Sequence, residues 1–280
     1  MMKYPEAAFP EGSNHTFLDF IFYNAGYQKL RFDSRRSDRR HTFRWSDGSE
    51  QYLKTLKSEF GLDQVTRRCK TDYEIALALC RWVSMRWAHH GYNESKRPDA
   101  LSILRAARHG KQFRCVEYSI VLQACLAAYG IKARIVGLLT IDIETIRGGG
   151  GHVVVEAYIK SHGKWVMLDP QNGVVPVLGR TPLNSVELQK AISMKDRRLS
   201  FAGRPAARYI KFIFPYLFYF QTRFDNRANK MRRQRHYKRT TALVLVPLGY
   251  KKPLKFQRGP ESKYLVRIET HSIRDFYPKV

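Results

Sequence analysis

The stretch KQFRCVEYSIVLQACLAAYGI, residues 111–131, decides the fold that the sequence predicts. Apolar residues fill most positions from Val116 to Ala128, which leaves hardly any polar face along the segment. A helix that is apolar on all sides belongs in the interior of a protein. Gly130 is placed to end this helix. We therefore expect a helix, buried in a core, that begins near Cys115.

Strands follow this helix and other helices precede it. Three segments rich in Val and Ile, separated by turns, read as strands: ARIVGLLTIDI (133–143), GHVVVEAYIK (151–160) and KWVMLDP (164–170). Upstream, Thr71 and Glu74 have capping-box spacing for a helix to about Arg86, and a shorter helix fits Asp99 to His109. Helices first and strands afterwards predict an α+β fold, with the thiol-bearing helix packed on an antiparallel sheet.

The remaining sequence divides around this core. We expect residues 1–68 to pack on the core as loops and short elements, and residues 69–180 to form the core. Residues 181–280 should form a basic, aromatic-rich extension with strands at TALVLV and KYLVRIE. The aromatic run YIKFIFPYLFYF, residues 209–220, has membrane-surface or base-stacking alternatives. Internal packing is the simpler expectation, because aromatic side chains bury large apolar areas.

The composition is that of a folded and strongly cationic protein. Hydrophobic residues make up 44% of the 280 residues, and the formal net charge is +26. Such a charge attracts anionic partners. The stretch from Lys195 to Arg239 holds 14 basic and 2 acidic residues. It supports an alternative function as a non-catalytic basic binding or scaffold protein for nucleic acid, acidic protein or an anionic membrane surface.

Cysteine usage and the two most apolar stretches bear on cofactors and location. Cys69, Cys80, Cys115 and Cys125 form no CxxC pair, so we expect no metal, no cofactor and no disulfide framework, with Cys69 and Cys80 as a buried pair. The start of the chain has no secretory pattern, and the run at 209–220 is shorter than the about 20 residues that span a bilayer. We therefore expect a cytoplasmic protein without a transmembrane segment.

A thiol at the start of a buried helix is a candidate nucleophile. Unpaired backbone N–H groups and the positive end of the helix dipole favour a thiolate there, and Arg114 and Lys111 add positive charge. The backbone N–H of Cys115 is placed to face an oxyanion formed on an acyl group. Cys125 lies in the same helix without polar neighbours. We expect it to be a core residue.

His152 and Asp169 are the candidate base and orienting carboxylate. His152 opens a strand after four glycines, which let another backbone approach closely. Asp169 ends the next strand, so a hairpin would bring its carboxylate to the imidazole. Direct opposition needs a turn centred between Lys160 and Ser161, whereas residues 161–163 resemble the turn. We therefore expect a bulge or strand stagger to correct the register. His109, at a helix end without a carboxylate nearby, is the weaker alternative base.

These three motifs, in this order, resemble the transglutaminase-like superfamily. The resemblance covers roughly Thr71 to Asn172 and lies in FRCVEYSIVLQACLAAYGIKARIVG, GHVVVEAY and WVMLDP. It implies a papain-like fold in which Cys115 is the nucleophile, His152 the general base and then acid, and Asp169 the orienting group.

The resemblance also bears on the reaction and on one tryptophan. Trp87 resembles the residue with which some relatives stabilise an oxyanion. The alternative is that Trp87, like Trp82, packs in the core.

Members of the superfamily include cross-linkers, peptidases, amidases, glycan-releasing enzymes and scaffolds. The resemblance ends before the last hundred residues, where animal cross-linking enzymes carry β-sandwich domains. We expect hydrolysis of peptide or side-chain amides through a thioester. The expected substrate is a protein or peptide, and an acidic one if the basic surface takes part in selecting it.

Overall fold

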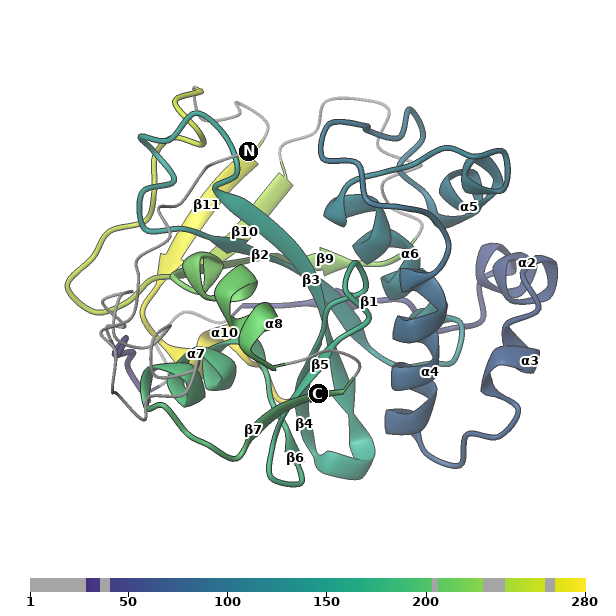
Figure 1. Cartoon of the computed structure of the whole chain (residues 1–280), viewed down its shortest axis with the longest axis horizontal. Coiled ribbons are helices and arrows are strands. Elements are labelled where there is room, and N and C mark those ends of the chain that lie inside the picture. Colours follow the sequence, from purple (N-terminus) through teal and green to yellow (C-terminus); the bar gives the residue numbers. More distant parts are fainter. Residues whose placement is uncertain (1–28, 36–40, 203–205, 229–239, 260–264) are drawn as a thin grey trace, which may run out of the picture.

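A six-stranded sheet runs through the middle of the molecule in the order β11-β10-β8-β2-β3-β4 (Figure 1). The structure is a computed structural model that describes residues 29–35, 41–202, 206–228, 240–259 and 265–280. Neighbouring strands are antiparallel except β10 and β11, which are parallel. The strands of this six-stranded sheet are β2 (Ala133–Leu139), β3 (Gly151–Ile159), β4 (Lys164–Leu168), β8 (Tyr219–Arg223), β10 (Thr240–Leu245) and β11 (Leu265–Thr270).

Two small strand pairings flank this sheet. One is a three-stranded sheet of β5 (Val175–Leu178), β6 (Thr181–Pro182) and β7 (Leu199–Ala202), in the order β6-β5-β7. The other pairs β1 (Arg44–Trp45) in parallel with β9 (Asp225–Asn226). Residues far apart in the sequence therefore meet beside the main sheet.

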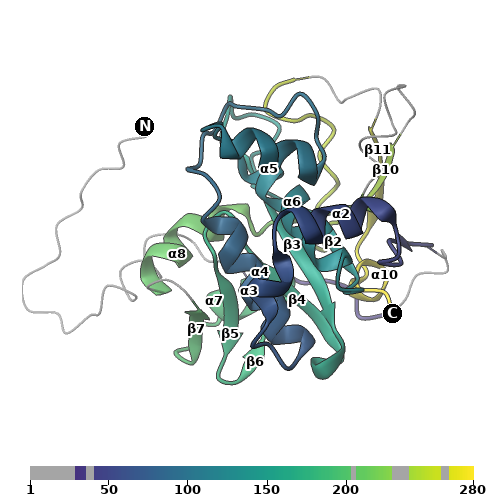
Figure 2. The same cartoon turned by 90° about the vertical axis from the view of Figure 1, so that its right-hand side faces the viewer.

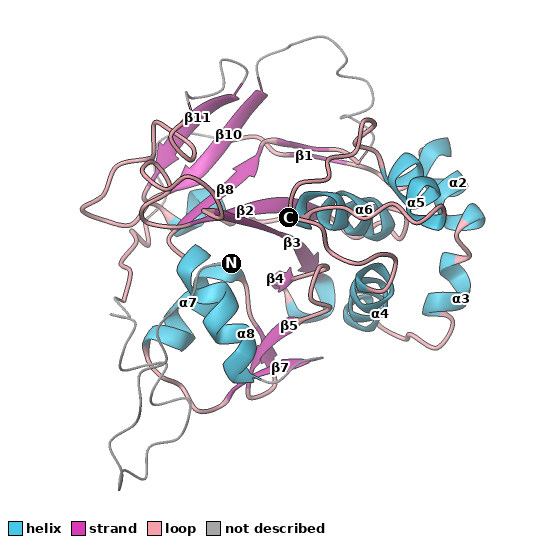
Figure 3. Ribbon diagram, turned by 45° about the horizontal axis from the view of Figure 1, so that its top comes forward, coloured by secondary structure: helices cyan, strands magenta, loops and turns pink. Residues whose placement is uncertain are grey.

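Helices cover both faces of the sheet, so the expected α+β class is confirmed (Figures 2 and 3). One face carries α2 (Gln51–Glu59), α3 (Leu62–Thr66), α4 (Asp72–Ser84), α5 (Ala100–Arg108) and α6 (Cys115–Ala127). The other carries α7 (Ser185–Ser193), α8 (Ala206–Ile213) and α10 (Ile273–Phe276). Alternate residues of β3 join the two cores: Val155 packs with the first set of helices and Val154 with the second.

The thiol-bearing helix α6 lies at the centre of the first core. Every residue from Glu117 to Ala127 is buried, as the all-apolar pattern predicts. The expected capping box of Thr71 and Glu74 is present on the neighbouring helix α4. On α5, Asp99 is the N-cap and accepts from the Ser102 N–H. By contrast, α6 has no side-chain cap at Arg114. Its first N–H groups are therefore open to another acceptor.

The N-terminal part of the chain is more helical than we expected. Instead of loops and short elements alone, the described part of residues 1–68 contains α2, nine residues long, and α3. Leu53 and Leu56 of α2 are fully buried, and the Tyr52 hydroxyl accepts from the Ala100 N–H at 2.8 Å. The prediction missed α2 because its short apolar face is completed only by contacts with distant helices.

A buried ion pair attaches the last turn of the chain to the sheet. The Arg134 guanidinium donates to Glu156 Oε2 at 2.7 Å, and both side chains are fully buried. Arg134 also donates to the Phe276 carbonyl, and the Tyr277 hydroxyl donates to Glu156 Oε1 at 2.9 Å. Because the charges are paired and hydrogen bonded, the cost of burying them is offset.

Candidate active site

Cys115 is the first residue of α6, and its side chain is half-buried. Its thiol is close enough to the His152 ring to help raise the pKa of the imidazole. The sulfur is therefore not sealed in the apolar core. Cys125, in contrast, is fully buried, as expected of a core residue, and burial raises the pKa of its thiol.

His152 and Asp169 form a buried pair beside the thiol. The imidazole Nε2 lies 2.9 Å from Asp169 Oδ2. Since Nε2 is occupied by the carboxylate, Nδ1 is the ring nitrogen left to meet the Cys115 sulfur. The structure thus brings together all three residues that the sequence analysis singled out, with the imidazole between the sulfur and the carboxylate.

No bulge is needed for this encounter, so the expected register correction is wrong. The β3–β4 hairpin is regular from Val155 opposite Leu168 to Ile159 opposite Lys164, around the turn Lys160–His162. Continued by one residue, this register places Asp169 opposite residue 154, two positions from His152 on the same face of β3. A diagonal pair of this kind is within reach of long side chains.

The Asp169 carboxylate receives five hydrogen bonds. Oδ1 accepts from the backbone N–H groups of Gln171 and Asn172, both at 3.1 Å. Oδ2 accepts from His152, from the Asn172 side-chain amide at 2.9 Å and from the Tyr209 hydroxyl at 2.8 Å. These donors hold the carboxylate in one orientation. The sequence analysis missed Asn172 and Tyr209 as site residues. Asn172 could have been found, because it follows Asp169 by three positions in a turn whose backbone and side chain can donate to that carboxylate.

Aromatic side chains from the C-terminal extension cover the imidazole. The Phe212 ring meets His152 edge to face, with centroids 5.0 Å apart, and the Tyr216 ring lies at 5.8 Å. Phe212 belongs to the last turn of α8, and Tyr216 belongs to the short 3-10 helix Phe214–Tyr216. The aromatic run therefore packs internally, as expected. No local signal linked it to His152, because the contact spans 60 or more residues of sequence.

Burial and charge act against each other at this pair. Burial alone disfavours a charged imidazole, but the Asp169 carboxylate, with a smaller effect of Cys115, raises the pKa of His152 to about 10. Burial likewise opposes the Asp169 charge, yet His152, Asn172 and Tyr209 hold the pKa of that carboxyl below its usual value. The pair therefore favours an imidazolium beside a carboxylate at neutral pH.

Trp87 lies at the same end of α6. Its ring stacks on Tyr118 with centroids 4.2 Å apart and meets Phe113 edge to face. The indole Nε1 is buried and has no hydrogen-bond partner among the residues that the structure describes. An unpaired buried donor is uncommon. Trp82, by comparison, packs against Phe60 on the outer side of α4.

Two further histidines can be compared with His152. His109 is exposed at the end of α5, so the structure gives it no place beside the thiol. His89, which the sequence analysis did not single out, pairs with Phe113 in an isolated bridge just before Cys115. Burial, and then the nearby His152 charge, lower the pKa of His89. It is therefore a neutral neighbour of the pair near pH 7.

The glycine-rich loop before His152 is held by a C-terminal loop. The Gln257 side-chain oxygen accepts from the N–H groups of Gly149 and Gly150 at 3.0 and 2.9 Å, and the Gln257 N–H donates to the Ile143 carbonyl at 2.7 Å. A side chain at Gly150 would press on Ile143 and Ile146. The glycines thus allow close packing within the loop that delivers His152.

Other expectations from the sequence have simpler outcomes. All four cysteines are free; Cys80 is buried and Cys69 is half-buried, outside α4. Within the described ranges, no three His, Cys, Asp or Glu side chains are grouped to hold a metal ion. None of the described helices is long and apolar enough to cross a membrane. Residues 229–239, the last part of the basic stretch Lys195–Arg239, lie outside the described residues.

Comparison with known proteins identifies the family of the core. Residues 62–170 match the family model of the transglutaminase-like superfamily, so this part of the chain is similar to a transglutaminase-like domain. The resemblance carried by the three motifs is thereby confirmed. The matched region contains Cys115, His152 and Asp169 and ends before Tyr209, Phe212 and Tyr216.

A solved structure of a candidate cysteine protease from Cytophaga hutchinsonii is also similar to this chain. The two share 16% identity with a TM-score of 0.34, and the similarity covers 55% of this chain and 49% of that one. This chain thus matches about half the length of that protein. No curated protein matches the sequence.

Proposed function

We propose that this protein is a cysteine-dependent amide hydrolase or acyltransferase in which Cys115, His152 and Asp169 act as one unit. The observation that carries the proposal is the buried 2.9 Å pair of His152 and Asp169 beside the thiol at the open end of α6. Nucleophile, base and orienting group in this arrangement fit acyl transfer through a thioester. The transglutaminase-like family of the core supports the same class of chemistry.

Attack on an amide would begin from a negative sulfur beside a charged imidazole. The raised pKa of His152 supports an imidazolium at neutral pH, and a neighbouring positive charge stabilises a thiolate. The Cys115 sulfur attacks the carbonyl carbon, and the oxygen takes up the negative charge. His152 then donates its proton to the nitrogen as the C–N bond breaks. An amine leaves and a thioester remains on Cys115.

Hydrolysis of the thioester returns the enzyme to its starting state. His152, now neutral, takes a proton from a water molecule that attacks the carbonyl carbon. The C–S bond breaks, and a carboxylic acid and the Cys115 thiolate are released. Asp169 keeps the same orientation of the ring through both steps. We assign the backbone N–H of Cys115 and the unpaired indole N–H of Trp87 as donors to the oxyanion.

The proposed substrates are peptide or side-chain amides of proteins, with water as the acceptor. An amine acceptor would turn the same thioester into a cross-link. No group of side chains in the described part of the site is arranged to select an amine, so we propose hydrolysis rather than cross-linking. The net charge of +26 favours acidic substrates through electrostatic attraction.

Alkylation of the thiols tests whether the three residues act together. Iodoacetamide should modify Cys115 at pH 7 at least tenfold faster than Cys69, the half-buried cysteine outside the site. His152→Ala should slow modification of Cys115 but leave Cys69 unchanged, as read by peptide mass spectrometry. Equal rates at the two cysteines, or no effect of His152→Ala in a folded protein, would contradict the proposal.

Formation of the thioester tests the reaction itself. An activated acyl ester such as p-nitrophenyl acetate should acylate Cys115 and release nitrophenol in a burst, which intact-mass spectrometry can follow. Cys115→Ala should abolish this acylation, whereas Cys125→Ala, in the same helix, should retain it. Transfer to water or to added glycine methyl ester then distinguishes hydrolysis from acyl transfer.

A further inference from the structure

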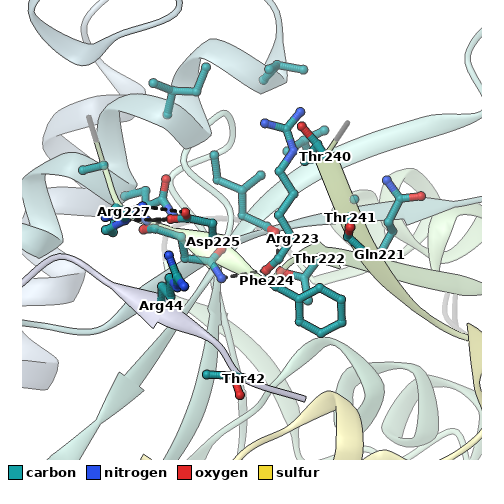
Figure 4. Close-up of a pocket in the computed structure, with 18 residues that line it drawn as sticks. Thr42, Arg44, Gln221, Thr222, Arg223, Phe224, Asp225, Arg227, Thr240 and Thr241 are labelled. Atoms are coloured by element: carbon teal, nitrogen blue, oxygen red, sulfur yellow. Dashed lines mark hydrogen bonds and ion pairs between the residues drawn. The ribbon is translucent and has the colours of Figure 1, made fainter. Parts of the chain in front are cut away.

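A pocket outside the candidate active site lies on the α6 face of the sheet, beside the β1–β9 pair (Figure 4). Its volume is about 430 Å³, which is within the usual range for small-molecule sites of roughly 300 to 1,000 Å³. Its apolar wall comes from Val116 and Ile120 of α6, Ile135 of β2 and Val153 of β3. The other walls are polar and come mostly from residues beyond the transglutaminase-like domain.

Arginine dominates the polar side of this pocket. Arg44, Arg223 and Arg227 all line it, against one acidic residue, Asp225. Arg227 is paired with Asp225 at 2.8 Å. Figure 4 shows Arg44 and Arg227 near Asp225, whereas Arg223 extends away from them toward Thr240. The lining of the pocket therefore carries two more arginines than acidic side chains.

Neither Arg44 nor Arg223 makes an ion pair with any residue in the described ranges. Arg223 is an exposed residue, yet the protein around it lowers the pKa of its guanidinium through partial desolvation. A cation that has lost part of its water without gaining a carboxylate is poorly stabilised. The planar guanidinium fits carboxylate or phosphate oxygens with two parallel hydrogen bonds. A bound anion would thus supply the negative charge that the described part of the protein does not place beside Arg223.

Hydroxyl groups stand close to this unpaired arginine. Thr240 and Thr241, at the start of β10, line the pocket and are half-buried. Each offers one O–H donor to an anionic oxygen. The Thr222 hydroxyl, in contrast, already donates to the Ile135 carbonyl at 3.0 Å. Donors on one side and an apolar wall on the other define an amphipathic site.

We propose that this pocket binds a small organic anion, whose carboxylate or phosphate meets Arg223 and Thr240 and whose apolar body lies against Val116 and Val153. The site is distinct from the proposed triad but adjoins it on two elements. Val116 follows Cys115 on α6, and Val153 follows His152 on β3. A ligand here would contact the residues that directly follow Cys115 and His152 in the sequence.

Binding of small probes to the full chain tests this site. The protein should carry Cys115→Ala, so that the outcome is independent of the proposed chemistry. Titration calorimetry would compare phenyl phosphate and 3-phenylpropionate with the neutral 3-phenylpropanamide and with inorganic phosphate. We expect one of the two aromatic anions to bind at least about tenfold more tightly than the amide and than inorganic phosphate. Which anion binds better identifies the group as phosphate or carboxylate.

Charge-matched variants separate a site from general attraction to a basic protein. Arg223→Gln should weaken binding of the preferred probe about tenfold or more. Arg180→Gln removes the same charge at an exposed position outside the pocket, and binding should be unchanged. Thermal unfolding of each variant verifies the fold. Equal affinity for the anion and the amide, or equal losses in Arg180→Gln and Arg223→Gln, would overturn the proposal.

Discussion

Replacing Asp169 with Asn should lower the pKa of His152 and remove a pH-dependent part of the stability. In the native protein the carboxylate outweighs burial and raises the pKa of His152 to about 10. Asn is nearly the same size and can still bond the ring, but it carries no charge. Burial, which opposes the imidazolium, is then no longer offset. We expect the pKa of His152 to fall to its ordinary value of 6.5 or below.

The sign and size of the stability effect follow from proton linkage. Because the pKa of His152 is raised in the folded protein, its stabilisation is complete below about pH 6.5 and is lost as the pH rises toward 10. Within this window the folded chain holds a proton that the unfolded chain has released. The free energy of unfolding should therefore decrease by about 1.4 kcal/mol per pH unit. Asp169→Asn should abolish this decrease.

Urea unfolding of two matched proteins measures the effect. Both carry Cys115→Ala, so that the comparison concerns only His152 and Asp169, and only one carries Asp169→Asn. Between pH 7 and pH 8.5 their difference in unfolding free energy should shrink by about 2 kcal/mol. Asp142→Asn, at an exposed position, should give a curve parallel to its parent. Parallel curves for Asp169→Asn as well would refute the coupling between carboxylate and imidazole.

Three other substitutions test the surroundings of the site. Tyr209→Phe removes one of the five donors to Asp169 and should slow alkylation of Cys115 about tenfold, whereas Tyr219→Phe, on β8, should leave that rate unchanged. Glu156→Gln leaves the Arg134 charge buried without its partner and should lower the free energy of unfolding by about 3 to 5 kcal/mol in urea titrations. Gly150→Ala places a methyl group 2.6 Å from the Ile143 side chain and should lower the free energy of unfolding by about 1 to 3 kcal/mol in the same assay. An unchanged free energy of unfolding would mean that the loop shifts to make room.

The parts of the fold that depend on local rules could be predicted from the sequence. Thr71 caps its helix as the spacing indicated, α5 lies within the range expected for it, and Gly130, with φ of 69°, follows the end of α6. The three strands after α6 also lie where the Val and Ile patterns place them. These features depend on residues within a few positions of one another, so a single sequence contains the information.

Contacts between distant segments could not be predicted in the same way. The meeting of His152 and Asp169 was expected, but through a bulge, because the turn position was the only guide to the register. Tyr209 reaches Asp169 across 40 residues of sequence, and Arg134 reaches Phe276 across 142. No local pattern distinguishes Tyr209 from the other aromatic residues of its run. Such partners emerge only from the packed structure.

The C-terminal extension completes the site as well as the sheet. Strand β8 pairs with β2 from Val136 opposite Thr222 to Leu139 opposite Tyr219, so the central sheet continues directly from the transglutaminase-like domain into the extension. The extension also brings Tyr209 to Asp169 and aromatic rings onto the imidazole. The domain supplies Cys115, His152 and Asp169, whereas the extension covers the imidazole with Phe212 and Tyr216 and donates from Tyr209 to the carboxylate. Because the pKa of His152 reflects burial on one side and the Asp169 carboxylate on the other, the chemistry proposed for the core depends on the extension as well.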